Sequence, residues 1–143
     1  MIFDNQGRWI MEKFIEFFKN DRFAANAGVV LLEVKLGYAK ARMMVTKEHL
    51  NAGGVCQGGA LFTLADLVFA AVANSREQLT FSLSANITFL RAAKEGYVYA
   101  EAVEAFNHRR IPFIEVRITD EAGEPIAVMT SSGYRKDVEL SLP

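Results

Sequence analysis

The sequence predicts a single α+β domain, residues 1–143, in which an antiparallel sheet curls around one long buried helix, with a second helix near the N-terminus. Three observations lead to this prediction. Two strand-like segments occur before residue 50, a continuous apolar run follows them, and four more strand-like segments fill the rest of the chain. Strands joined by short turns pair antiparallel, and a helix that is apolar on every side needs a sheet to cover it.

The segment from about residue 8 to residue 20 has the spacing of an amphipathic helix, for which Asp4 or Asn5 can supply the start. Its apolar positions are Ile10, Phe14, Phe17 and Phe18. Two strands are expected next, over residues 28–35 and 38–46, with a tight turn at Leu36-Gly37 between them.

A glycine-rich loop, residues 51–59, then opens onto the apolar run 60–74, which is rich in Ala and Leu and too long for a strand. We expect a buried helix there. The remaining strands are expected at 79–90, 97–106, 114–120 and 125–134, each following a short turn. Over 79–90 the apolar side chains alternate with Ser, Thr and Asn, which predicts one apolar and one polar face.

Asp66 is the residue that does not fit the apolar helix. Burying an unpaired carboxylate costs several kcal/mol, so such a group is usually paired, protonated or open to a cleft. A carboxyl in this setting has a raised pKa, which suits a general base or a nucleophile near neutral pH. The alternative is a capping role, or a place on a narrow polar strip with Thr63.

Gly58 and Gly59 stand at the predicted start of this helix, where backbone N–H groups lack helical acceptors and face the positive end of the helix dipole. Such amides can polarise a carbonyl group, and glycine lets a substrate approach them. A flexible connection is the alternative reading. Gly58 and Asp66 are separated by roughly 12 Å along a helix, so one carbonyl carbon can meet both only if they come from different subunits.

Composition excludes several classes of function. The formal net charge of −1 gives no cationic field for a nucleic acid, and no apolar run reaches the length of a membrane span. The single cysteine, Cys56, excludes an internal disulfide and suggests no zinc site. Because no secretory signal is visible either, we expect a cytoplasmic protein with no bound metal, no membrane partner and no nucleic-acid partner.

Residues 49–75, HLNAGGVCQGGALFTLADLVFAAVANS, resemble the signature segment of hot-dog-fold acyl-CoA thioesterases of the phenylacetic-acid-degradation type. NITFLRAAKEG and EVRITDEAGEPIAV resemble further segments of that family, so the likeness runs from Phe18 to Lys136. It implies a hot-dog fold and hydrolysis of an acyl-CoA thioester, with coenzyme A present only as part of the substrate. It also implies a homodimer with shared sites, which often pairs again into a tetramer.

The resemblance also assigns roles to residues. Asp66 would be the catalytic carboxylate, as general base or nucleophile, and the Gly58 amide would polarise the thioester carbonyl. Asn51 would orient the water or the carbonyl, and Ser82 would help to hold the water. Substrate-binding roles are also expected for Gln57, Gly59, Arg91, Arg109 and Arg110, the arginines through the phosphates of coenzyme A. Scattered solvated charges are the alternative for the arginines.

Gln57 departs from the family pattern, because histidine usually precedes the two glycines. Glutamine donates a hydrogen bond but cannot titrate, so a proton-transfer role is lost there. A non-catalytic acyl-CoA-binding or sensing protein is therefore the alternative function. Hydration of an enoyl-CoA is a third possibility, although it usually needs a histidine near the aspartate. For Cys56, for His49 and for the aromatic residues near the N-terminus, including Phe23, structural roles are expected before an active-site role.

Overall fold

The computed structural model describes residues 8–143, so Asp4 and Asn5 lie outside the described residues. The elements are α1 (Arg8–Phe18), α2 (Arg22–Asn26), β1 (Val29–Lys35), β2 (Tyr38–Val45), the short 3-10 helix η1 (Lys47–His49), α3 (Gly58–Ala73), β3 (Gln78–Phe89), β4 (Gly96–Phe106), β5 (Phe113–Asp120) and β6 (Pro125–Glu139). The predicted elements are all present, and α2 and η1 are two short helices that the sequence patterns did not predict.

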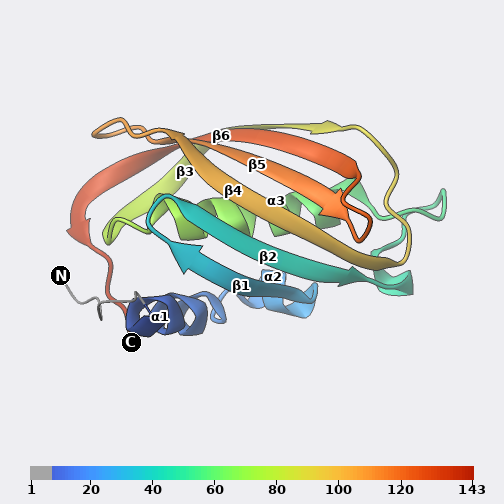
Figure 1. Cartoon of the computed structure of the whole chain (residues 1–143), viewed down its shortest axis with the longest axis horizontal. Helices are drawn as coiled ribbons and strands as arrows, with labels where there is room; N and C mark the ends of the chain where they lie inside the picture. The colour runs from blue at the N-terminus through green and yellow to red at the C-terminus, as the bar shows by residue number, and fades with distance from the viewer. Residues whose placement is uncertain (1–7) are drawn as a thin grey trace.

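The six strands form one antiparallel sheet in the order β1-β2-β4-β5-β6-β3. The sheet curls around α3, which lies across its concave face, while α1 and α2 lie beside β1 (Figure 1). This is the predicted α+β arrangement of a sheet around a long central helix.

The pairing of β3 differs from the simplest expectation. The turn at Lys94-Glu95-Gly96 suggested that β3 pairs with β4, but β3 instead pairs with β6 at the far edge of the sheet. Between Leu90 and Glu95 the chain crosses from β3 at the edge of the sheet to β4, an interior strand between β2 and β5. As a result β3 has only one partner strand within the protomer, and its other edge is unpaired.

The predicted apolar face of β3 is wrong for half of the strand. A bulge between Ser82 and Ser84 shifts the register against β6, and such an extra residue reverses the side-chain alternation. Phe81 pairs with Tyr134 on the outer face and is 50% exposed, whereas Phe89 beyond the bulge faces the helix side and contacts Gly58. Ser82 pairs with Gly133 and lies on the helix side of the sheet.

The sheet covers most of α3, but not all of it. Nine of its residues are buried: Leu61, Leu64, Ala65, Leu67, Val68, Phe69, Ala71, Val72 and Ala73. The side that faces away from the sheet carries Gly59, Phe62, Thr63, Asp66 and Ala70, which are half-buried or exposed. The expectation of a helix covered all round is therefore wrong in the protomer, and Asp66 does share a strip with Thr63.

Polar contacts fix the C-terminal end of α3 against the sheet. The Asn74 side chain donates to the Thr80 carbonyl at 3.2 Å and accepts from the Thr80 amide at 2.9 Å. Beyond it, the buried carboxylate of Glu104 lies between Arg76 at 2.9 Å and Arg135 at 3.6 Å. Breaking a buried ion pair strongly destabilises a protein, because it leaves an uncompensated charge in the interior. The pairs of Glu104 with the two guanidinium groups therefore hold this end of the helix rigidly.

Candidate active site

Asp66 is half-buried on the outward strip of α3, with no ion-pair partner anywhere in residues 8–143. Burial raises the pKa of its carboxyl, and the negative charge of Asp21 raises that pKa further. Both causes disfavour the carboxylate form in the protomer. A carboxyl of this kind can accept a proton closer to neutral pH than an exposed aspartate can.

The N-terminus of α3 begins at Gly58, after Gln57 as the N-cap. The Gln57 carbonyl accepts from the amides of Ala60 and Leu61, which leaves the amides of Gly58 and Gly59 without an acceptor inside the helix. Their position at the positive end of the dipole of a 16-residue helix favours an anion or a polarised carbonyl.

Both glycines are also needed for space. A Cβ at Gly58 would lie 2.9 Å from Cζ of Phe89, and a Cβ at Gly59 would lie 2.5 Å from Oε1 of Gln57. The Gln57 side chain therefore folds back over the first turn without capping it. A larger residue at either position would displace a neighbouring side chain from the helix start.

Asn51 organises the glycine-rich loop. Its Oδ1 accepts from the amides of Gly53 at 2.9 Å and Val55 at 3.3 Å, while its backbone amide donates to the Val55 carbonyl. This use of Oδ1 leaves the Nδ2 group as the side-chain donor that a substrate carbonyl or a water could use.

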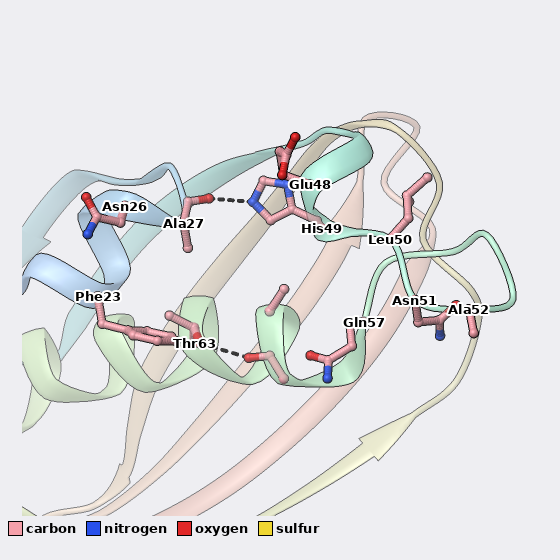
Figure 2. A pocket seen from close by; sticks show the side chains of 12 residues that line it. Phe23, Asn26, Ala27, Glu48, His49, Leu50, Asn51, Ala52, Gln57 and Thr63 are labelled. Atoms are coloured by element: carbon pink, nitrogen blue, oxygen red, sulfur yellow. Dashed lines mark hydrogen bonds between the residues drawn. The ribbon is translucent and has the colours of Figure 1, made fainter.

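Two cavities flank the N-terminus of α3, and Asn51 lines both. The larger, about 840 Å³, lies between α2, η1 and the first turns of α3; we call it the α2 cavity, and Phe23, His49, Gln57, Gly59 and Thr63 are among its lining residues (Figure 2). The smaller, about 470 Å³, is the Phe89 cavity, lined by Gly58, Phe89 and Arg91 among others. Gly58 thus lines the Phe89 cavity and its neighbour Gly59 lines the α2 cavity.

Ser82 lines neither cavity, whereas Arg91 does line one. Ser82 is exposed on the helix side of β3, an orientation that follows from the bulge. Arg91 lines the Phe89 cavity, but its guanidinium group already pairs with Asp120 at 2.7 Å and with Glu124 at 3.7 Å.

Arg109 and Arg110 are not brought to the helix start within one protomer. They follow β4, whose first residues are near the Phe89 cavity and whose 11 residues span roughly 35 Å. Arg110 instead contacts Asp137 at 2.7 Å and the Arg135 carbonyl, at the end of the sheet that holds the C-terminus of α3. These two arginines can reach a substrate at Gly58 only from another subunit.

Cys56 has no features of a nucleophile. It is buried, burial raises the pKa of its thiol, and its Sγ lies 3.6 Å from the Gln57 carbonyl. A thiol in such a setting stays protonated and acts as a small apolar side chain.

Three residues at this site were not assigned to it by sequence reasoning. Asp21 is the N-cap of α2 and acts on Asp66 through its charge. Phe23 lines the α2 cavity, and His49 joins α2 to η1 by a 2.6 Å contact from Nε2 to the Ala27 carbonyl. Aspartate is a common N-cap residue, so the sequence could have indicated the role of Asp21. It could not indicate the contact of His49 with Ala27, which lies 22 residues away along the chain.

Two kinds of feature are absent from the part of the chain that the structure describes. Among residues 8–143, His, Cys, Asp and Glu form no group that could hold a metal ion. None of the helices in this part of the chain combines the length and hydrophobicity that a bilayer span requires. What the site contains is a half-buried carboxyl, free helix-start amides and two adjoining cavities.

Comparisons with known proteins bear on the family and the fold. The family model described as the thioesterase superfamily matches residues 53–127. A putative esterase of Archaeoglobus fulgidus is 40% identical over 119 residues, which is 82% of this chain and 77% of that protein. The acyl-coenzyme A thioesterase PaaI of Escherichia coli is 28% identical over 119 residues, covering 82% of this chain and 85% of its own.

Solved structures give the same answer for the fold. The structure of the Escherichia coli PaaI protein, from the phenylacetic acid degradation operon, superposes with a TM-score of 0.85 and 25% sequence identity. The match covers 92% of this chain and 99% of that one. The curled antiparallel sheet around α3 is therefore a hot-dog fold, as the sequence resemblance implied.

Proposed function

The chain belongs to the thioesterase superfamily, and we propose that it hydrolyses acyl-coenzyme A thioesters at a site shared by two protomers. As a member of this superfamily it is a thioester hydrolase. Two groups carry the proposal. One is the half-buried carboxyl of Asp66 on α3, and the other is the Gly58 amide at the start of α3, which has no acceptor inside its helix.

The chemistry follows from this pair. The thioester oxygen accepts from the Gly58 amide, which makes the carbonyl carbon electrophilic and stabilises the oxyanion that develops. Asp66 takes a proton from a water as its oxygen bonds to that carbon, or its carboxylate attacks the carbon itself. On the water route the C–S bond then breaks and the proton taken by Asp66 passes to the thiolate of coenzyme A, which gives a carboxylic acid and a free thiol. If Asp66 itself attacks, breakage of the C–S bond leaves a mixed anhydride on Asp66, and a water then hydrolyses it, supplies the proton of the thiol and frees the carboxylate.

Two protomers are required by distance. Gly58 and Asp66 of one helix are about 12 Å apart along its axis, which is too far for one carbonyl group. We propose that two α3 helices face each other across a two-fold axis, so that each Asp66 meets the partner's Gly58. The arrangement gives two equivalent sites per dimer.

The exposed strand β3 supports a dimer. It is the edge strand of the sheet, and Phe81 and Leu83 on it are 50% and 57% exposed. A long edge strand with exposed apolar side chains is a template for pairing with another chain. We propose that β3 pairs with β3 of a second copy, which continues the sheet and brings the outward strips of the two α3 helices together.

The arm of coenzyme A fits the Phe89 cavity best, because both Gly58 and Arg91 line it. The guanidinium group of Arg91 would exchange part of its pairing with Asp120 and Glu124 for a phosphate. Arg109 and Arg110 would contribute only if the partner subunit brings them there.

The experiment that tests this function is a thiol-release assay on purified protein with a panel of acyl-coenzyme A substrates. Hydrolysis should release one free thiol per acyl group, and Asp66→Ala should remove most of the turnover. Tight binding of the panel without thiol release would instead favour an acyl-CoA-sensing protein, for which the non-titrating Gln57 is the motivating residue. Loss of enoyl absorbance without thiol release would indicate a hydratase.

A further inference from the structure

The α2 cavity has one wall that the catalytic chemistry does not use. That wall is α2, and the side chain it presents is Phe23, which is 75% exposed and lies beside Thr63 of α3 (Figure 2). Among the residues described, no other large apolar side chain is more exposed. An aromatic ring left open to solvent inside a cavity offers apolar contact to a ligand.

The position of Phe23 is fixed although α2 has only five residues. At the N-terminus of α2, Asp21 accepts from the Ala24 amide at 3.1 Å, and Ala24 itself is buried. At the C-terminus, the Ala27 carbonyl lies 2.6 Å from Nε2 of His49, whose Nδ1 accepts from the Thr46 amide at 3.0 Å. With the Thr46 amide as donor to Nδ1, Nε2 carries the hydrogen that Ala27 accepts, and α2 is tied to η1.

The opposite wall is the first turn of α3. Thr63 donates its hydroxyl to the Gly59 carbonyl at 2.8 Å, so its methyl group remains for apolar contact. Gly59 and Ala60 add no bulk, which leaves room for a ligand between α2 and α3. The carboxylate of Glu48 on the cavity's margin disfavours an anionic ligand.

The length of the cavity bounds what it can hold. An acyl group whose carbonyl is at Gly58, the start of α3, reaches Thr63, five residues on, after roughly 7.5 Å. Within that length it can place about six carbons or one aromatic ring against Phe23.

We infer that the acyl group of the substrate occupies the α2 cavity and that Phe23 selects neutral, apolar acyl groups long enough to reach its ring. This inference rests on the proposed hydrolysis of acyl-coenzyme A and gives it a substrate class: acyl chains of about six carbons, or acyl groups with a single aromatic ring. An acetyl group is too short to touch Phe23, so it gains nothing from that contact.

The test compares kcat/KM for hexanoyl-, phenylacetyl- and acetyl-coenzyme A in the full-length protein and in Phe23→Ala. The ratio of hexanoyl to acetyl, and of phenylacetyl to acetyl, should fall about tenfold in the variant, as expected when a pocket loses its contact with several carbons. Phe23→Leu should retain part of each ratio. Because Phe23 is exposed on a helix and alanine favours helix, the variants should fold.

Leu36→Ala is the matched control, because Leu36 is 57% exposed in the β1–β2 turn and lines neither cavity. Its ratios should equal those of the unaltered protein. Unchanged ratios in Phe23→Ala, with thiol release still measurable, would overturn the inference and leave the proposed function standing. Absence of thiol release from every substrate in the unaltered protein would instead reject the proposed function itself.

Discussion

Asp21 at the N-cap of α2 raises the pKa of Asp66 on α3, as the second cause after burial. Two carboxyl groups from different helices therefore influence each other on the uncovered side of α3. Asp21 has a structural task as well, since it accepts from the Ala24 amide. The pair connects the short helix that walls the α2 cavity to the proposed catalytic group.

The substitution Asp21→Asn tests this connection. Asparagine caps a helix as well as aspartate does, so α2 should remain folded while the negative charge is removed. The pKa of Asp66 should then fall, because one cause that disfavours its carboxylate is gone. Since turnover needs the carboxylate form, the acid limb of the pH profile of kcat should move to lower pH.

Glu115→Gln is the control for this measurement, because Glu115 lies on β5 between two buried inward-facing residues and pairs only with Arg117. Its pH profile should match that of the unaltered protein. An acid limb that stays in place in Asp21→Asn would show that Asp66 is not the group that titrates in turnover, or that Asp21 does not reach it.

Asp66→Asn should separate activity from stability. The amide keeps the shape but cannot accept a proton or attack, so we expect kcat to fall by at least about a thousandfold. Stability should change in the other direction. The pKa of the Asp66 carboxyl is raised in the folded protein. The free energy of unfolding therefore falls as pH rises through the range between the ordinary pKa and the raised pKa.

Above the raised pKa that loss is fully present, and the neutral amide removes it. We expect Asp66→Asn to gain on the order of 1 kcal/mol, or roughly 3 °C in the midpoint of thermal unfolding. At acid pH, where Asp66 is protonated, the gain should vanish. A variant that is less stable than the original at neutral pH would contradict the description of Asp66 as an unpaired, half-buried acid.

Gly58→Pro tests the amide as the polarising group. Proline is tolerated at the first position of a helix, and the extended conformation of Gln57, with φ −64° and ψ 137°, suits a residue before proline. The change removes the N–H donor and, like alanine, adds bulk beside Phe89, so kcat should fall by about a hundredfold to a thousandfold. Gly58→Ala adds bulk near Phe89 but keeps the N–H group, and its loss should be much smaller. Equal losses in the two variants would attribute the effect to bulk.

His49→Ala should destabilise the protein although His49 is not one of the buried core residues. It leaves the Ala27 carbonyl and the Thr46 amide without their partner, which costs about 1–3 kcal/mol in urea unfolding when water does not replace it. His108→Ala is the comparison, because His108 also accepts backbone amides but in an exposed turn. If the two variants lost equal stability, the contact of His49 between η1 and α2 would contribute no more than the hydrogen bonds of an exposed turn.

Periodicity located the strands and the long helices because those elements have a strong pattern over ten or more residues. It could not assign the partner of β3, since pairing with β6 depends on the curl of the whole sheet. It also could not place the bulge after Ser82, where the alternation of residue types continues through a backbone irregularity. Phe81 therefore lies on the outer face and Phe89 on the helix side, although the two residues share one sequence pattern and are each 50% exposed.

The site was readable from the sequence in part. Asp66 stood out as one acid in an apolar run, and the glycines marked the start of its helix. Phe23 gave no such signal, because an aromatic residue near an amphipathic helix normally belongs to the core. Its neighbours in space, Thr63 and Gln57, are 34 or more residues away along the chain, and only the fold brings them together.

The most direct measurement is complementation between two inactive subunits. Asp66→Asn and Gly58→Pro chains are co-expressed with different tags, and dimers that carry both are purified and assayed for thiol release. Each mixed dimer has one site with an intact Asp66 and an intact Gly58, so about half of the original turnover should return. If the mixed dimers are no more active than either variant alone, the acid and the amide do not meet across subunits.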